Sequence, residues 1–336
     1  MRLGSAGISV TPAERYANAV GNCWPVAIMP APGELLSSWL HRLAYANGVP
    51  PHYFGALLGA PGENWSARLD RALPDRILRL LGEHTHIPLE DIAALTVAPD
   101  PLARLRLSLR PGSQQTCAPG RQVTWLQFCP ACLADDETPY FRRGWSLATR
   151  VSCFRHGCRL RDRCPSCGEG LAPFSLTRLV PHQFCALCGA TLCKPTRPAA
   201  DGVRRLERLI DDLLRLHTAG HQLAEGRSLP DLLGSACFQF GGKRVSIARL
   251  SHRDRYQLLR HMTEGRSTPF GMRKSPAISC WKRVAQFAPA WSGLITSFTD
   301  AVLPRPKTGP CSTTAGPNLA DLVQAAARLH QKRQAL

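Results

Sequence analysis

The sequence predicts a mainly helical fold interrupted by two small cysteine-rich modules. Apolar residues recur at helical spacing on both sides of the middle region, for example over Leu35–Leu43 and Leu206–Leu214. Between Cys129 and Cys188, eight cysteine or histidine side chains fall into four close pairs. The chain has 336 residues, 44% hydrophobic and 20% charged, which is typical of a folded protein of two or three domains.

The N-terminal part is expected to consist of short helices. Residues 1–23 show no convincing periodicity and are expected to form a flexible leader, followed by a helical domain over residues 24–122. Asn47-Gly48 would end the first helix, and Pro50-Pro51 would allow the second to begin. The expected helices are Leu35–Leu43, His52–Leu58, about Pro74–Glu83 and Leu89–Leu95, with residues 97–122 as an irregular linker.

Short helices joined by tight turns are typical of helix-turn-helix units, which bind DNA, and equally of small bundles that do not. Arginines at expected exposed helix positions favour DNA slightly, and these are Arg42, Arg68, Arg71, Arg76 and Arg79.

The four close pairs predict two metal sites over residues 123–195. Two intervening residues let one turn aim both ligand atoms at a single ion, and tetrahedral zinc needs two such turns. Read in order, the pattern is C-x2-C-x20-C-x2-H and then C-x2-C-x17-C-x2-C. We therefore expect two structural Zn²⁺ ions per chain, each with four protein ligands and no position open for catalysis. The expected ligands are Cys129, Cys132, Cys153 and His156 for one ion, and Cys164, Cys167, Cys185 and Cys188 for the other.

Other interpretations of the cysteines are less favoured. Disulfides are typical of secreted chains, and no secretory signal or membrane span is visible, which points to a reducing cytoplasm. Gly168 and Gly189 directly follow two of the pairs, where a turn with positive φ is expected. Cys158 and Cys193 lie close enough to the pairs for either to replace a neighbouring ligand. The isolated thiols are expected to be ordinary core or surface residues, and these are Cys23, Cys117, Cys237, Cys280 and Cys311.

Residues 196–336 are expected to form a C-terminal helical region. The stripe Leu206–Leu214 is flanked by arginines, and further helices are expected near Asp254–Met262 and Asn318–Gln334. Residues 264–316 are rich in Gly, Pro and Ser and give no clear pattern.

The charge balance indicates nucleic acid as a partner. The formal net charge is +18, and seven thiolates with two Zn²⁺ would lower it to about +15. Arginine supplies most of this charge and binds phosphate bidentately, although net charge reports only nonspecific attraction. The residues we expect to contact nucleic acid are Arg142, Arg143, Arg150, Arg159 and Arg161. The acidic run Asp135–Glu137 is expected to be a solvated turn, because adjacent carboxylates on one loop make a poor two-metal site.

Two segments of the chain resemble the TniQ family, which includes the TnsD target selectors of transposons. One runs from Pro32-Gly33-Glu34 through Trp39-Leu40 and Arg42-Leu43-Ala44 to Asn47-Gly48. The other contains Phe128-Cys129-Pro130-x-Cys132, Trp145, Cys153-x-x-His156-Gly157, Cys164-Pro165-x-Cys167-Gly168 and Cys185-x-x-Cys188-Gly189. The resemblance covers about residues 24–195.

The resemblance implies an N-terminal helix-turn-helix domain, two tandem zinc-ribbon-like modules with the eight ligands above, and further helices. It also implies a non-catalytic accessory protein of transposition. Members of the family bind target DNA or a target-marking complex and recruit an AAA+ ATPase, which directs a DDE-type transposase. Some relatives are coupled to CRISPR effector complexes, and that partner, like a second copy of the chain, stays an open alternative.

Two other functions compete with this one. A zinc-containing DNA-binding transcriptional regulator would share the same modules. A metal-dependent nuclease using His156 would need an open coordination position, which four protein ligands do not leave.

Overall fold

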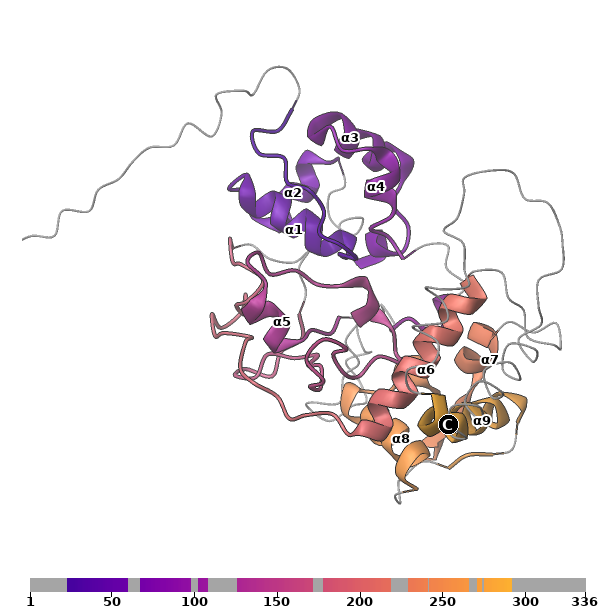
Figure 1. The fold of residues 1–336 in the computed structure, drawn as a ribbon. Coiled ribbons are helices and arrows are strands. Elements are labelled where there is room, and N and C mark those ends of the chain that lie inside the picture. Colours follow the sequence, from indigo (N-terminus) through magenta and orange to yellow (C-terminus); the bar gives the residue numbers. More distant parts are fainter. Residues whose placement is uncertain are drawn as a thin grey trace, which may run out of the picture.

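The computed structural model describes residues 23–59, 67–97, 102–107, 126–171, 178–218, 229–240, 242–265, 271–273 and 275–291. Within these ranges the fold is mainly helical, as expected, and it also contains one two-stranded sheet. Helices α1–α4 gather at one end of the molecule and α6–α9 at the other, and the cysteine-rich region with α5 packs against both (Figure 1). Most of the expected leader and the helix expected at Asn318–Gln334 lie outside the described residues. No helix of the described part is long and apolar enough to cross a membrane.

The N-terminal helices follow the sequence pattern closely. They are α1 (Leu36–Ala46), α2 (Pro51–Leu57), the 3-10 turn η2 (Ala67–Asp70), α3 (Asp75–Thr85) and α4 (Leu89–Ala93). Gly48 ends α1 with φ +71°, and His86 ends α3 in the left-handed region with φ +56°. The apolar stripe of α1 is fully buried, together with Phe54, Leu58 and Leu81. The layout of a helix-turn-helix stays a prediction.

Two buried acids anchor this helical region. Glu34 accepts hydrogen bonds from Ser38 Oγ at 2.7 Å and Arg42 Nη1 at 3.0 Å. Arg42 was expected to be exposed, but this ion pair with a fully buried carboxylate holds its side chain 13% exposed. Asp70 accepts a hydrogen bond from the Ser37 backbone N–H at 2.7 Å, and its burial raises its pKa to about 7.

The middle region has little regular secondary structure. In residues 126–171 and 178–200 the structure has the short helix α5 (Pro130–Asp135), the 3-10 turn η4 (Arg143–Ser146) and several isolated β-bridges. Its core consists of the buried cysteines with a few large apolar residues, including Phe128, Phe141 and Trp145.

The C-terminal region contains elements that the sequence pattern did not reveal. Helices α6 (Asp201–Thr218) and α8 (His252–Glu264) lie where helices were expected. Helices α7 (Leu229–Ser235) and α9 (Pro276–Trp291), and the antiparallel hairpin of β1 (Cys237–Phe240) and β2 (Lys243–Ser246), were not expected. Helix α9 lies inside the unassigned stretch 264–316, where it buries Trp281 against Phe238. The short turns η3 (Ala103–Leu105) and η6 (Ile247–Arg249) complete this part.

Buried polar residues join the three regions. His182 Nε2 lies 3.2 Å from the Ser38 carbonyl oxygen, and the His182 ring meets His41 edge-on at 4.1 Å. Burial lowers the pKa of His41 to about 4 and also lowers the pKa of His182, so both rings are neutral. Through His41 and His182, α1 packs against the second cysteine-rich module.

Two further joints tie the middle region to the C-terminal helices. Glu207 on α6 accepts hydrogen bonds from the backbone N–H groups of Val151 and Ser152 and from Ser152 Oγ. Arg255 on α8 is 1% exposed and donates to the Leu250 and Ala148 carbonyls and to Gln127 Oε1. Because buried polar groups are costly unless they are paired, these contacts fix how the regions meet.

The raised pKa of Asp70 predicts a specific pH dependence of stability. Between its unfolded pKa, near 4, and its folded pKa, about 7, the folded state holds a proton that the unfolded state releases. Rising pH over this range should therefore lower the free energy of unfolding of the wild type relative to Asp70→Asn, by at most about 1.4 kcal/mol per pH unit. Denaturant unfolding of both proteins from pH 4 to 8 measures the difference. The exposed Glu83→Gln serves as the control, and a pH-independent difference for Asp70→Asn would contradict the assignment.

Candidate metal centres

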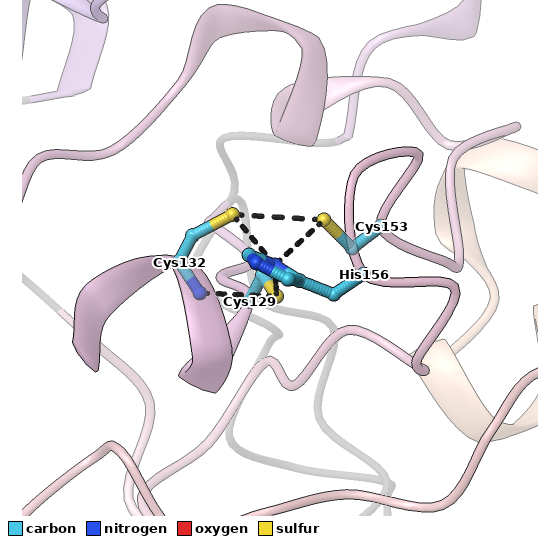
Figure 2. Close-up of side chains that lie close together, drawn as sticks. All are labelled: Cys129, Cys132, Cys153 and His156. Carbon is cyan, nitrogen blue, oxygen red and sulfur yellow. Dashed lines mark hydrogen bonds between the residues drawn. The ribbon is translucent and has the colours of Figure 1, made fainter. Parts of the chain in front are cut away.

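The first cluster brings together the side chains of Cys129, Cys132, Cys153 and His156 (Figure 2). Cys129 and Cys132 lie at the start of α5, and Cys153 and His156 lie in a turn that faces them. The sulfur atoms of Cys132 and Cys153 are 3.6 Å apart. His156 presents Nδ1 to the three thiols, at 3.4 Å from Cys129, 3.3 Å from Cys132 and 3.6 Å from Cys153.

The second cluster consists of four cysteines, Cys164, Cys167, Cys185 and Cys188. The sulfur atoms of Cys164 and Cys188 are 3.7 Å apart, and those of Cys167 and Cys185 are 3.8 Å apart. Cys164 and Cys185 are buried, whereas Cys167 and Cys188 are exposed, so this site lies at the protein surface.

These spacings fit tetrahedral metal ions. In each cluster the four candidate ligand atoms all lie within 4.8 Å of one another. A tetrahedron with metal–sulfur bonds of about 2.3 Å has edges of about 3.8 Å, slightly shorter where nitrogen replaces sulfur. The observed separations match those edges, and they are far longer than the sulfur–sulfur bond of a disulfide. Both clusters can therefore hold a metal ion.

Three of the four ligand pairs share one backbone geometry. In the turn that starts at Cys164, the Gly168 N–H donates to the Cys164 carbonyl at 3.0 Å, and the Cys164 N–H donates to the Glu169 carbonyl at 2.8 Å. The turns that start at Cys153 and Cys185 repeat this pattern. Each needs a residue with positive φ after the second ligand, and glycine occupies that place in all three, with φ between +62° and +74°.

Backbone N–H groups also point at the sulfur atoms. The N–H of Cys132 donates to Cys129 Sγ, and that of Ser166 donates to Cys164 Sγ, both at 3.4 Å. Burial raises the pKa of Cys164, but the N–H groups of Cys167 and Ser166 outweigh it, and the pKa falls to about 7. In the first cluster, hydrogen bonds from Cys129 and Cys132 lower the pKa of Cys153. These contacts favour the thiolate form of Cys153 and Cys164, as a metal requires. Without a metal ion, burial and the hydrogen bonds shared within the clusters raise the pKa of Cys129, Cys132, Cys167 and Cys185.

A carboxylate orients the only imidazole in the first cluster. His156 Nε2 lies 2.9 Å from Asp135 Oδ2, on the side of the ring opposite the thiols. A metal-binding histidine commonly donates its second N–H to a carboxylate, which fixes the ring and the tautomer. The solvated turn expected for Asp135–Glu137 is wrong for Asp136 alone, because Asp135 is 48% exposed beside the imidazole and Glu137 is exposed. The Asp136 side chain is only 9% exposed and pairs with Arg142 at 2.9 Å and Arg155 at 3.4 Å.

The two neighbouring cysteines lie beside the clusters. Cys158 Sγ is 3.5 Å from Cys129 Sγ, and the hydrogen bond from Cys129 helps to lower the pKa of Cys158 to about 7. Cys193 packs against the apolar residues of the middle region. Neither belongs to the two groups of mutually close ligand atoms.

Most of the arginines expected to contact nucleic acid already have protein partners. Arg142 pairs with Asp136 and covers the rings of Tyr140 and Trp145, and Arg143 donates to the Ala94 carbonyl. Arg150 pairs with Asp211 and covers the ring of Phe154. Arg159 stacks on the ring of Tyr256 and Arg161 donates to the Pro195 carbonyl, and both also line an open groove.

Part of this chain matches a known protein family. Residues 25–160 match the family model described as TniQ, which confirms the resemblance over the helical region and the first cluster. The match ends before Cys164, so the second cluster lies outside it. A search of curated proteins finds no match.

Removing one ligand tests the second cluster. Cys164→Ser should remove one of two bound metal ions and unfold the surrounding module, because the binding free energy of a structural ion is folding free energy. Metal analysis and thermal unfolding measure both effects. Cys193→Ser is the matched control and should keep both ions, and equal metal content in the two variants would contradict the ligand assignment.

The Asp135–His156 contact predicts a change in metal affinity. Asp135→Asn should weaken metal binding at the first cluster by about 10–100-fold, since it removes the carboxylate that orients the imidazole. Competition with a chromogenic chelator resolves the two sites. Glu137→Gln, an exposed acid two residues away, should leave both affinities unchanged. An equal effect of both substitutions would indicate bulk charge as the cause.

Proposed function

Since residues 25–160 belong to the TniQ family, we propose that this protein is a non-catalytic accessory factor of transposition that selects the target site. It binds target DNA or a target-marking complex and recruits an AAA+ ATPase, which in turn directs a DDE-type transposase. The observation that carries the proposal is the family match together with a basic chain built around two closed ligand sets.

The metal ions in this proposal are two Zn²⁺. Seven cysteine sulfurs and one imidazole nitrogen form the kind of soft ligand set that zinc occupies in structural sites. When bound, each ion crosslinks two distant turns and leaves no position for a substrate. The ligands Cys129, Cys132, Cys153 and His156 would hold one ion, and Cys164, Cys167, Cys185 and Cys188 the other.

A scaffold role agrees with the surroundings of the clusters. Ser38 Oγ lies within hydrogen-bond distance of both Glu34 and His182, which superficially resembles a nucleophilic site. Ser38 and Glu34 are completely buried, however, and Ser38 Oγ donates to Glu34 while accepting from the Phe141 N–H. A substrate has no access to this hydroxyl, so the group supports structure and not group transfer.

The helical region is the candidate for target recognition. Helices α3 and α4 are joined by the tight turn His86–Pro88, and Arg76 and Arg79 are exposed on α3. Exposed arginines on a short helix suit contacts to phosphate or to base edges. A transcriptional regulator would use the same features, so recruitment of the ATPase is what separates the two functions.

Mapping insertions in cells tests this function. Without the protein, insertions should disappear or lose their site preference, and the wild-type gene should restore them. Cys193→Ser should also restore them, while Cys164→Ser should not, because its scaffold is lost. Co-purification with its cognate AAA+ ATPase should be kept by Cys193→Ser and lost by Cys164→Ser. If the number and distribution of insertions were unchanged in cells without this protein, the result would contradict the proposal.

A further inference from the structure

An open groove lies between the cysteine-rich region and helix α8. Its volume is about 900 Å³. One wall is the segment 159–165, which connects the two metal clusters, and the other is formed by residues on α8, with the segment 195–197 alongside. Its charged lining residues are Arg159, Arg161, Asp162, Arg163, Arg197, Arg253 and Arg260.

The groove is strongly positive. Six arginines against one aspartate give it a formal charge of +5. Arg260 is neutralised locally by Glu264, at 2.7 Å. Arg197 and Arg253 are exposed, and neither has an ion-pair partner among the described residues. A concave surface lined by one sign of charge focuses its field and attracts polyanions.

Two of the arginines are held in place before any ligand arrives. Arg159 lies over the ring of Tyr256 at 3.8 Å, and Arg161 Nη2 donates to the Pro195 carbonyl at 3.0 Å. The Nε atoms of both are buried and have no hydrogen-bond acceptor among the described residues. Guanidinium groups that are already held in place lose little entropy when they bind an oxyanion.

The lining favours phosphate contacts over base stacking. Tyr256 is 4% exposed beneath Arg159, and His252 is partly buried and donates from Nε2 to the Val151 carbonyl oxygen at 3.1 Å. The groove therefore offers no open aromatic face, which single-stranded nucleic acid would need for its bases. Arginines without such a face suit the regularly spaced phosphates of a duplex.

We propose that this groove binds the sugar–phosphate backbone of duplex DNA without reading its sequence. The inference rests on the proposed function, because a protein that selects a target site would contact target DNA. It adds a place for that contact away from the helices α1–α4, in which Arg197 and Arg253 contact phosphate directly. Residues 159–163 lie in the chain between His156, a ligand of the first cluster, and Cys164, a ligand of the second. Both metal clusters therefore hold this wall of the groove in position.

The test compares two variants of the full-length, metal-loaded protein with equal charge change. Arg197→Gln with Arg253→Gln removes the two unpaired groove arginines. Arg205→Gln with Arg208→Gln removes two exposed arginines of α6 that do not line the groove. Fluorescence anisotropy measures binding to two duplexes of unrelated sequence and to one single strand, over a series of salt concentrations. A poly-glutamate peptide serves as the competing polyanion.

The groove variant should bind both duplexes more weakly, with a log–log salt slope less negative by about 2, since each lost phosphate contact contributes about 0.9. The α6 variant should keep the wild-type slope. Equal slopes for groove variant and wild type would overturn the groove assignment and leave the proposed function standing. The groove assignment would also be overturned if the groove variant lost binding to poly-glutamate but kept wild-type binding to DNA. That result would indicate an acidic protein as the partner of the groove.

Absence of any duplex binding by the wild type would also overturn the groove assignment. The proposed function would not be affected, because the protein could select the target through a target-marking complex. The insertion mapping described above tests that function separately.

Discussion

The gathering of seven thiols and one imidazole into two compact clusters is the constraint on which the rest of the structure depends. The described middle region has one short helix, one 3-10 turn and isolated bridges, and five of the thirteen buried residues in its core are cysteines. So little apolar burial supplies limited stability to a segment of this length. A structural zinc ion at each cluster would contribute on the order of 10 kcal/mol, so we expect this region to fold only with its metal bound.

Both the N-terminal and the C-terminal helical regions pack against this cysteine-rich region. His182, in the second cysteine-rich module, contacts the Ser38 carbonyl on α1, while Glu207 and Arg255 bind backbone groups of residues 148–152. These contacts are buried and specific in direction, so a shift in one region would leave polar groups unpaired in the next. Under the proposed function this fixed geometry would aid recruitment, because DNA and the ATPase would have to be held at defined positions.

The sequence predicted the parts of the structure that depend on local pattern. The spacing of cysteines and histidine identified all eight clustered side chains, and the apolar stripes located α1, α6 and α8. Helix α9 was missed because its stretch was judged by the Gly, Pro and Ser around it, although Ile278, Trp281 and Val284 are buried at helical spacing.

Features that depend on tertiary contacts could not be predicted from spacing. Asp135 lies 21 residues from His156, and its run of three acids resembled a solvated turn until the fold brought the imidazole to it. The groove joins Arg197 to Arg253 across 56 positions of the chain, and nothing local distinguishes these arginines from the others. Conversely, Arg42 and Arg142 looked available in sequence, yet buried carboxylates hold both.

X-ray absorption spectroscopy at the zinc edge, on wild-type protein purified without chelators, tests the central claim most directly. The account predicts two zinc ions per chain, with a mean shell of about 3.5 sulfur neighbours at about 2.3 Å and about 0.5 nitrogen neighbours at about 2.0 Å. A protein that is folded without metal, or a shell of oxygen ligands, would contradict it.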